Sequence, residues 1–375
     1  MTLSPPAHIR IPPDLLPADG RFGCGPSKVP ASAVQALAEV GASFLGTSHR
    51  QAPVRNVVAR IRAGLHDLFS LPPGWEVVLG NGGTTAFWDV ATFGLIEWKS
   101  QHCSFGEFSA KFAAAADAAP HLAPPDVISA AAGSHPKPAA DPAVDVYALT
   151  HNETSTGVMM RLERPVGADG LIVVDATSGA GGLPWDPTQV DTYYFAPQKC
   201  FASEGGLWIA LCSPAGVERI ERINSSDRWI PASLDLKIAL ENSRLDQTYN
   251  TPALATLFLL DQQLQWMLGL GGLDACVARS EQSAATLYGW AEKSPYAVPF
   301  VADEAMRSTV VGTIDLEGVD ANAVSAVLRE NGIVDTESYR KLGRNQLRIG
   351  LFPSIDPADV EALTACIDHV VAALS

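Results

Sequence analysis

The chain has 375 residues, of which 47% are hydrophobic and 18% charged, so it can bury a large core and form two domains or three. A net charge of −15 argues against nonspecific nucleic-acid binding, which needs a cationic surface. No apolar run reaches the roughly eighteen residues of a membrane-spanning helix, and the first thirteen residues contain no signal-peptide core. The six cysteines are scattered without a CxxC pair, which predicts reduced thiols, a cytoplasmic location and no bound metal.

Predicted strands and helices alternate through the first two-thirds of the chain. A proline-rich arm precedes a turn cluster at residues 23–27, and a later strand runs into a glycine-rich loop followed by a helix. Such alternation predicts an α/β domain with a mostly parallel sheet and helices on its faces. Helices are expected at 30–45, 54–68 and 84–93, and strands at 76–79, 144–150, 171–174, 192–195 and 207–211.

The last third is expected to form a second, smaller domain. Asp356-Pro357-Ala358-Asp359 begins its final helix well, because it offers an N-cap acid, a proline at the first helical position and an acid in the first turn. Two long helices, 252–268 and 273–293, lead into this domain, which holds strands at 308–314 and 346–351 and a helix at 321–331. The predicted divisions are an arm of residues 1–18, a large domain of 19–262 and a small domain of 263–375.

Two strand ends carry the groups on which a functional interpretation depends. The aromatic strand 192–195 leads into a turn that ends on Lys199, and the buried strand 171–174 ends on Asp175. An amine and an acid at the carboxyl ends of successive strands can face one ligand across an α/β sheet. Pyridoxal phosphate needs that pair, an amine to bond to its aldehyde and an acid to keep its pyridine nitrogen protonated. The alternatives are a solvated loop lysine and a carboxylate that caps a helix.

Two other segments suit the same ligand. Gly82-Gly83-Thr84-Thr85 lies at a strand-to-helix turn, where backbone N–H groups can approach a phosphate. It contains neither the GK[ST] of a P-loop nor a GxGxxG fingerprint, and an ordinary glycine turn is the alternative. Phe108 can stack on a planar ring, although most aromatic side chains simply fill the core.

In order and spacing, these features resemble the phosphoserine aminotransferase family over nearly the whole chain, and look most like its actinobacterial branch. The resemblance implies the aspartate-aminotransferase-like fold type I, an α/β large domain with a mostly parallel seven-stranded sheet plus a smaller α+β C-terminal domain. It also implies a homodimer whose active site is shared between subunits. The motifs that carry it are Phe22-Gly23-Cys24-Gly25-Pro26-Ser27, Ser48-His49-Arg50, the GGTT loop, Gly106-Glu107-Phe108, Asn152-Glu153-Thr154, Asp175, Gln198-Lys199 and Tyr249-Asn250-Thr251-Pro252.

The resemblance implies pyridoxal phosphate as cofactor and a role for each matching residue. Lys199 would be joined covalently to the cofactor, Asp175 would pair with its pyridine nitrogen, and Phe108 would stack on its ring. Thr154 would hydrogen-bond to the phenolic oxygen of the cofactor. The cofactor phosphate would be bound by Gly83, Thr84, Thr85 and Gln198, and by Asn250 and Thr251 from the other subunit.

Arginines would select the substrates. Arg348 matches the family residue that binds the α-carboxylate, for which a planar guanidinium is suited because it donates two parallel hydrogen bonds. His49 and Arg50 match the pair that clamps the substrate phosphate, and Arg340 matches a further phosphate-binding arginine. Its neighbour Tyr339 stands where many members have histidine.

The implied reaction is reversible amino transfer between L-glutamate and 3-phosphohydroxypyruvate, giving O-phospho-L-serine and 2-oxoglutarate in serine biosynthesis. Use of 4-phosphohydroxythreonine, in pyridoxine biosynthesis, stays open. So do three other functions: an alanine–glyoxylate-type aminotransferase, a cysteine desulfurase, and a catalytically inactive binding protein of the same fold. A desulfurase needs a reactive cysteine on a mobile loop, whereas Cys200, next to Lys199 in a turn between strands, is interpreted as structural. An NAD-dependent dehydrogenase would also have this α/β pattern, but the chain lacks the dinucleotide-binding fingerprint that such an enzyme needs.

Overall fold

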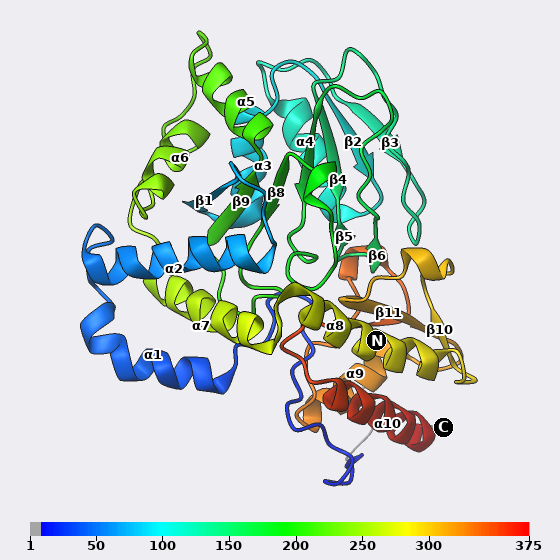
Figure 1. Cartoon of the computed structure of the whole chain (residues 1–375). Helices are drawn as coiled ribbons and strands as arrows, with labels where there is room; N and C mark the ends of the chain where they lie inside the picture. The colour runs from blue at the N-terminus through cyan, green and yellow to red at the C-terminus, as the bar shows by residue number, and fades with distance from the viewer. Residues whose placement is uncertain (1–8, 375) are drawn as a thin grey trace.

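The computed structural model describes residues 9–374, which form a larger and a smaller lobe (Figure 1). The larger lobe is built on a seven-stranded sheet. Its strands are β1 (Glu76–Asn81), β2 (Ser100–Ser104), β3 (Asp126–Ser129), β4 (Val146–Thr150), β7 (Leu171–Asp175), β8 (Thr192–Phe195) and β9 (Leu207–Cys212).

The sheet has the strand order β1–β9–β8–β7–β4–β2–β3. Strands β8, β7, β4, β2 and β3 are parallel neighbours, whereas β9 runs antiparallel to both β1 and β8. The register pairs Thr150 with Asp175 and Asp175 with Tyr194, so β4, β7 and β8 end side by side. Ligands of open α/β sheets bind at such an edge, outside the carboxyl ends of the strands.

Helices cover both faces of this sheet. The helices of the larger lobe are α1 (Ala31–Phe44), α2 (Ala52–Leu68), α3 (Gly83–Gly94), α4 (Glu107–Ala118), α5 (Pro214–Asn224), α6 (Leu236–Arg244) and α7 (Leu254–Leu270), and α8 (Gly272–Ala291) leads from α7 into the smaller lobe. Tyr194 and Trp208 pack with α3, α4 and α6, whereas Tyr193 and Phe195 pack with α2 and α7, because successive strand residues point to opposite faces. Burial on both faces explains why these strands read as continuous apolar runs in the sequence.

The smaller lobe has its own aliphatic core around a three-stranded antiparallel sheet. Its elements are β10 (Ala297–Pro299), β11 (Val311–Leu316), β12 (Gln346–Gly350), α9 (Ala321–Glu330) and α10 (Pro357–Leu374), with α8 packed against α10. The N-terminal segment joins this lobe, since Phe22 is buried in its core and accepts a hydrogen bond from Gly350 N at 2.7 Å. Ser27 N then donates to the carbonyl oxygen of Gln198 at 2.7 Å, so residues 22–27 connect the two lobes.

The expected α/β fold, with its mostly parallel seven-stranded sheet and smaller α+β lobe, is confirmed. The sequence interpretation missed β2, β3 and α4, which complete one side of the sheet. Residues 1–8 of the expected arm lie outside the described residues. The remaining short elements are the hairpin of β5 (Asn152–Glu153) and β6 (Val158–Met159) and three 3-10 turns, η1 (Pro187–Gln189), η2 (Glu304–Met306) and η3 (Arg340–Leu342).

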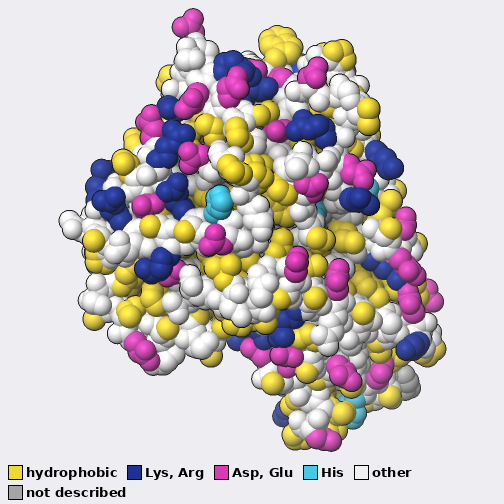
Figure 2. Space-filling model, viewed as in Figure 1, with side chains coloured by type: hydrophobic (Ala, Val, Ile, Leu, Met, Phe, Trp, Pro, Cys, Tyr) yellow, Lys and Arg dark blue, Asp and Glu magenta, His cyan; other side chains and the backbone are white. Residues whose placement is uncertain are grey.

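The surface and the helices agree with the composition. On the face shown in Figure 2, basic and acidic side chains are interspersed rather than gathered into one basic patch. Within residues 9–374, none of the helices combines the length and the apolar character needed to cross a membrane.

Candidate active site

A cavity of about 240 Å³ lies at the carboxyl ends of β4, β7 and β8. Seven of the residues predicted from the sequence as site residues line it, which brings together segments from along the whole large lobe. The lining residues are Gly25, Pro26, Thr84, Thr85, Trp88, Phe108, Thr150, Asn152, Thr154, Asp175, Thr177, Gln198 and Lys199.

Lys199 lies in this cavity with its amine on a backbone carbonyl. Its Nζ donates to the carbonyl oxygen of Cys24 at 2.8 Å and lies 5.9 Å from the centre of the Phe108 ring. Burial lowers the pKa of Lys199 to about 8, because a charged amine loses solvation there. Close approach of the N-terminal segment requires glycine at position 25, where φ is +139° and a Cβ would lie 2.0 Å from Nζ. The amine is therefore desolvated and fixed in direction.

Asp175 ends β7 as a buried carboxylate whose two oxygens are both hydrogen-bonded. Trp88 on α3 donates its indole N–H to Oδ2 at 3.0 Å. Thr177 donates its backbone N–H at 3.0 Å and its hydroxyl at 2.5 Å to Oδ1. These three donors fix the orientation of the carboxylate. Asp175 can therefore present a fixed negative charge to a protonated ring nitrogen.

Phe108 is placed by the N-terminus of α4, which a second buried carboxylate holds. Glu153 is fully buried, and its Oε2 accepts hydrogen bonds from the backbone N–H groups of Phe108 at 3.1 Å and Ser109 at 2.9 Å. The hydroxyls of Ser109 and Ser155 donate to the same carboxylate at 2.9 and 2.7 Å. An anion is favourable at this end of a helix because the first N–H groups lack intrahelical acceptors.

The glycine-rich turn before α3 offers backbone N–H groups to the cavity. Gly82 and Gly83 have φ values of +113° and +70°, and in the described structure no side chain caps the helix that follows. Within the described chain, the buried oxygens Oε1 of Gln198 and Oδ1 of Asn152 also have no hydrogen-bond partner. Buried polar atoms are nearly always paired, so this cavity suits a polar ligand with an anionic group at the α3 end. Its residues therefore fit pyridoxal phosphate.

Seven other predicted site residues are not among the lining residues in the described chain: Gly83, which begins α3 next to the lining residue Thr84, Arg348, and the five described next. His49 contacts Thr251, with 3.3 Å between Nδ1 and Oγ1, and Asn250 accepts a hydrogen bond from the Asn81 side chain at 2.5 Å. Burial and the charge of Arg50 lower the pKa of His49. Arg340 belongs to η3 in the smaller lobe. His49, Arg50, Asn250 and Thr251 therefore form a second group, apart from the amine and the acid.

Arg348, on β12, is also outside the lining set but reaches its edge. Its Nη1 donates to the carbonyl oxygen of Thr154 at 3.2 Å, next to the cavity. Its Nε is buried without a hydrogen-bond partner among residues 9–374. The guanidinium therefore has donors left for a ligand.

The sequence interpretation did not find several residues that hold the site in shape. Gly25 was noted only as part of a turn, and Glu153 only as part of a motif. Trp88 and Thr177 carried no signal of their own, because their contacts with Asp175 depend on how α3 and the end of β7 meet.

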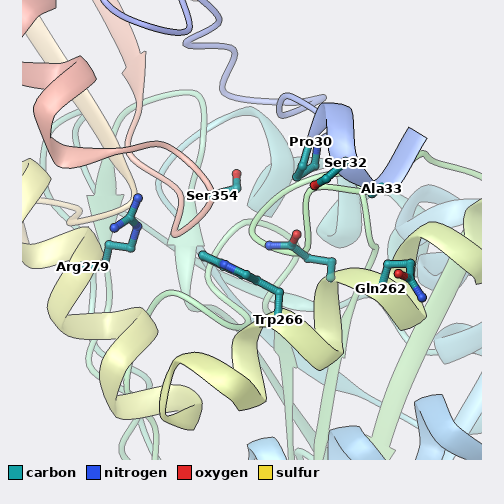
Figure 3. A pocket seen from close by; sticks show the side chains of 8 residues that line it. Pro30, Ser32, Ala33, Gln262, Trp266, Arg279 and Ser354 are labelled. Carbon is teal, nitrogen blue, oxygen red and sulfur yellow. The ribbon is translucent and has the colours of Figure 1, made fainter. Parts of the chain in front are cut away.

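A larger hollow of about 420 Å³ lies elsewhere, beside α7, α8 and the start of α1 (Figure 3). Its lining residues are Pro30, Ser32, Ala33, Gln262, Gln263, Trp266, Arg279 and Ser354. Arg279 there donates to Pro353 O and to Asp356, each at 2.8 Å. These lining residues include neither a lysine nor a carboxylate, so the acid–amine pair belongs to the smaller cavity.

Comparison with known proteins agrees with this geometry. The model of the class-V aminotransferase family matches residues 22–337, and the chain belongs to this family. It is 63% identical to a phosphoserine aminotransferase of a Nocardioides species and 61% identical to that of Rhodococcus jostii, each over 97% of this chain and 98% of the relative. A phosphoserine aminotransferase structure from Cytophaga hutchinsonii, 25% identical, superposes with a TM-score of 0.87 over 93% of this chain and 99% of that one.

Within class V, the chain is therefore a member of the phosphoserine aminotransferases, which are pyridoxal-phosphate-dependent transaminases. The resemblance seen in the sequence is confirmed, together with the cofactor that it implied.

Proposed function

We propose that the Lys199 cavity carries out reversible amino transfer between L-glutamate and 3-phosphohydroxypyruvate, giving 2-oxoglutarate and O-phospho-L-serine. One observation carries the proposal: an amine with a lowered pKa and a hydrogen-bonded carboxylate face one cavity from the ends of neighbouring strands. Family membership supplies the reaction class.

We propose for the cofactor the same contacts that the family resemblance implied. Pyridoxal phosphate, when bound, supplies an electron sink for the charge that develops at the substrate Cα. Lys199 would hold it covalently, Asp175 would pair with its ring nitrogen and Phe108 would stack on the ring. Thr154 would serve its phenolic oxygen, and Gly83, Thr84, Thr85 and Gln198 would hold its phosphate, with the α3 N-terminus in support.

Lys199 is also the proposed proton carrier. With a pKa near 8, a usable fraction of its amine is neutral at physiological pH, so Nζ can take the proton from the substrate Cα and return it. The Cys24 carbonyl orients Nζ before substrate arrives. Trp88 and Thr177 donate to the Asp175 carboxylate and hold it in the direction in which it would pair with the ring nitrogen.

Arg348 is proposed to bind the α-carboxylate that both amino-acid substrates share, which its unpaired Nε and its place beside Thr154 support. His49, Arg50 and Arg340 are proposed to bind the substrate phosphate.

We propose a homodimer in which each subunit completes the other's site. Asn250 and Thr251 would reach the partner's cofactor phosphate. His49 lies against Thr251, so His49 and Arg50 would act in the same site as that pair. The proposal includes a cytoplasmic location and the division into arm 1–18, large domain 19–262 and small domain 263–375, supported by a separate core in the smaller lobe.

A desulfurase has less support. Cys200 is fully buried, its Sγ donates to the Ser178 carbonyl oxygen at 3.3 Å, and burial raises the pKa of its thiol. A reactive cysteine needs the opposite, an exposed thiol with a lowered pKa.

The deciding experiment replaces the amine. Lys199→Ala is expected to abolish formation of 2-oxoglutarate from glutamate and 3-phosphohydroxypyruvate while the far-UV circular dichroism and the melting temperature stay near wild type. Lys137→Ala, on an irregular segment outside the cavity, is the control and keeps its activity. Turnover by folded Lys199→Ala protein would refute the assignment, and wild-type preference for alanine over phosphoserine as amino donor would refute the substrate.

A further inference from the structure

One aromatic side chain of the smaller lobe touches two site residues that come from different elements. Tyr339, which precedes η3, has its ring centre 6.1 Å from that of Phe108, with the planes inclined at 54°. The guanidinium of Arg348 lies over the Tyr339 ring, with Cζ 5.3 Å from the ring centre. Tyr339 therefore stands between the proposed cofactor-stacking residue and the proposed carboxylate-binding residue.

Arg348 has few other restraints. Nη1 makes one hydrogen bond to a backbone carbonyl, and Nε makes none with the described residues. A long side chain with so few contacts loses rotamer freedom when it binds a ligand, and that loss weakens binding. An aromatic face attracts a guanidinium without using its N–H groups, so it can fix the plane of Arg348 and leave donors free for a carboxylate.

The Tyr339 ring also lies against the ring of Phe108. The carboxylate of Glu153 fixes its backbone, and the Tyr339 ring adds a contact to the Phe108 side chain itself. A tilted aromatic pair at this centre distance is a favourable arrangement.

An ion pair holds the same segment down. Lys341 pairs with Glu107 in the first turn of α4, so the segment 339–342 is docked on α4 at two points. The Lys341 side chain is 59% exposed, and ion pairs of exposed side chains contribute little to stability. The Tyr339 ring is therefore the part of this segment that can influence Phe108 and Arg348.

We propose that Tyr339 is a positioning residue for this reaction: its ring holds the Arg348 guanidinium in its carboxylate-binding orientation and braces Phe108. The inference rests on the proposed function and adds to it a residue that acts through others. Its role belongs to the aromatic face and not to the hydroxyl, and it serves the carboxylate that both substrates share.

The test compares Tyr339→Phe, which keeps the ring, with Tyr339→Leu, which removes it. Lys341→Met is the matched control, because it removes the ion pair of the same segment and leaves the ring. Steady-state kinetics are measured with glutamate and with phosphoserine as donor, and circular dichroism of the bound cofactor reports its ring environment.

Tyr339→Leu is expected to raise KM about tenfold for both donors and to change kcat by less than about threefold, as loss of a desolvated cation–π contact predicts. The cofactor dichroism should change with it. Tyr339→Phe and Lys341→Met should stay within about twofold of wild type, since Phe offers a similar face. If Tyr339→Leu lowers the melting temperature, Tyr339→Met, which keeps most of the volume, replaces it.

Three results overturn the inference. A KM increase limited to phosphoserine would mean that Tyr339 serves the phosphate. Equal defects in the Phe and Leu variants would mean that the hydroxyl acts. Unchanged KM values in Tyr339→Leu would mean that the ring has no such role. A wild-type enzyme that does not use phosphoserine would instead refute the proposed function, so the two failures are distinguishable.

Discussion

Lys199 shows how burial alone prepares an amine for chemistry. No carboxylate hydrogen-bonds to its Nζ in the described structure; the partner there is the neutral carbonyl of Cys24. Desolvation is the largest cause of its lowered pKa, and the nearby charge of Arg348 acts in the same direction. Because the solvation of the charged form is lost and little replaces it, the neutral, nucleophilic form becomes accessible near physiological pH.

This environment predicts the pH dependence of cofactor uptake. Below the pKa the amine is protonated and cannot attack an aldehyde, so uptake by cofactor-free protein should be slow. The rate should rise through pH about 8 and level off above it, because the neutral form is then complete. Stopped-flow absorbance of the cofactor measures this rate. A midpoint near 10.5, the ordinary lysine value, would show that the amine is solvated in the cofactor-free protein.

Residues at strand ends could be predicted from the sequence, because an apolar run marks a buried strand and the polar residue that follows the run marks its end. Lys199 and Asp175 follow apolar runs, and the parallel register brings the two strands together. Trp88 and Cys24 could not be found in this way, because the contacts they make span 87 and 175 residues of chain. Their roles depend on the packing of helices and of the N-terminal segment, which local pattern does not encode.

At the scale of elements, the N-terminus of α4 depends on one buried charge. Glu153→Gln keeps the side-chain shape but presents an amide to donors that need an anion. Unfolding free energy should fall by about 2 kcal/mol, typical of hydrogen bonds to a charged group, and cofactor affinity should fall because Phe108 is less well placed.

Urea denaturation and cofactor titration measure the two effects of Glu153→Gln. Glu218→Gln is the control, since its side chain is 77% exposed on α5, and both quantities should stay near wild type. A stable Glu153→Gln protein with normal cofactor affinity would show that the α4 N-terminus needs no anion.

The strands that the sequence interpretation missed differ in composition from those it found. Strand β2 reads Ser-Gln-His-Cys-Ser, with no apolar run, yet it is almost wholly buried. Its polar groups are paired inside the protein: Ser100 with His102 at 2.9 Å, and Gln101 with both backbone groups of Ala139. Pairing of this kind offsets the cost of burial but leaves no periodic signal. Strands β7 and β8 are fully buried and consist mainly of apolar and aromatic residues, and their predicted bounds agree with the structure to within one residue.

For the whole molecule, the group of His49, Arg50, Asn250 and Thr251 decides how many chains make one site. If Arg50 acts in the partner's site, a dimer of one Lys199→Ala subunit and one Arg50→Ala subunit contains one intact site. Co-expression should then restore about a quarter of wild-type activity, since half of randomly paired dimers are mixed and each has one good site of two.

Assays of the separate and the co-expressed variants measure this complementation. Co-expression of Lys199→Ala with Asp175→Ala is the control, because both residues line the cavity of one chain and every mixed dimer should be inactive. Activity of the Lys199→Ala and Arg50→Ala mixture no greater than that of Arg50→Ala alone would place Arg50 in its own subunit's site.

The segment from Phe22 to Cys24 has a consequence for communication between the lobes. At one end its backbone is bonded to Gly350, two positions along β12 from Arg348, and at the other its carbonyl holds the Lys199 amine. Three consecutive residues therefore join the strand that carries Arg348 to the nitrogen of Lys199. A fragment that lacks residues 22–24 would lose the contact with β12 and the acceptor of the Lys199 amine at once.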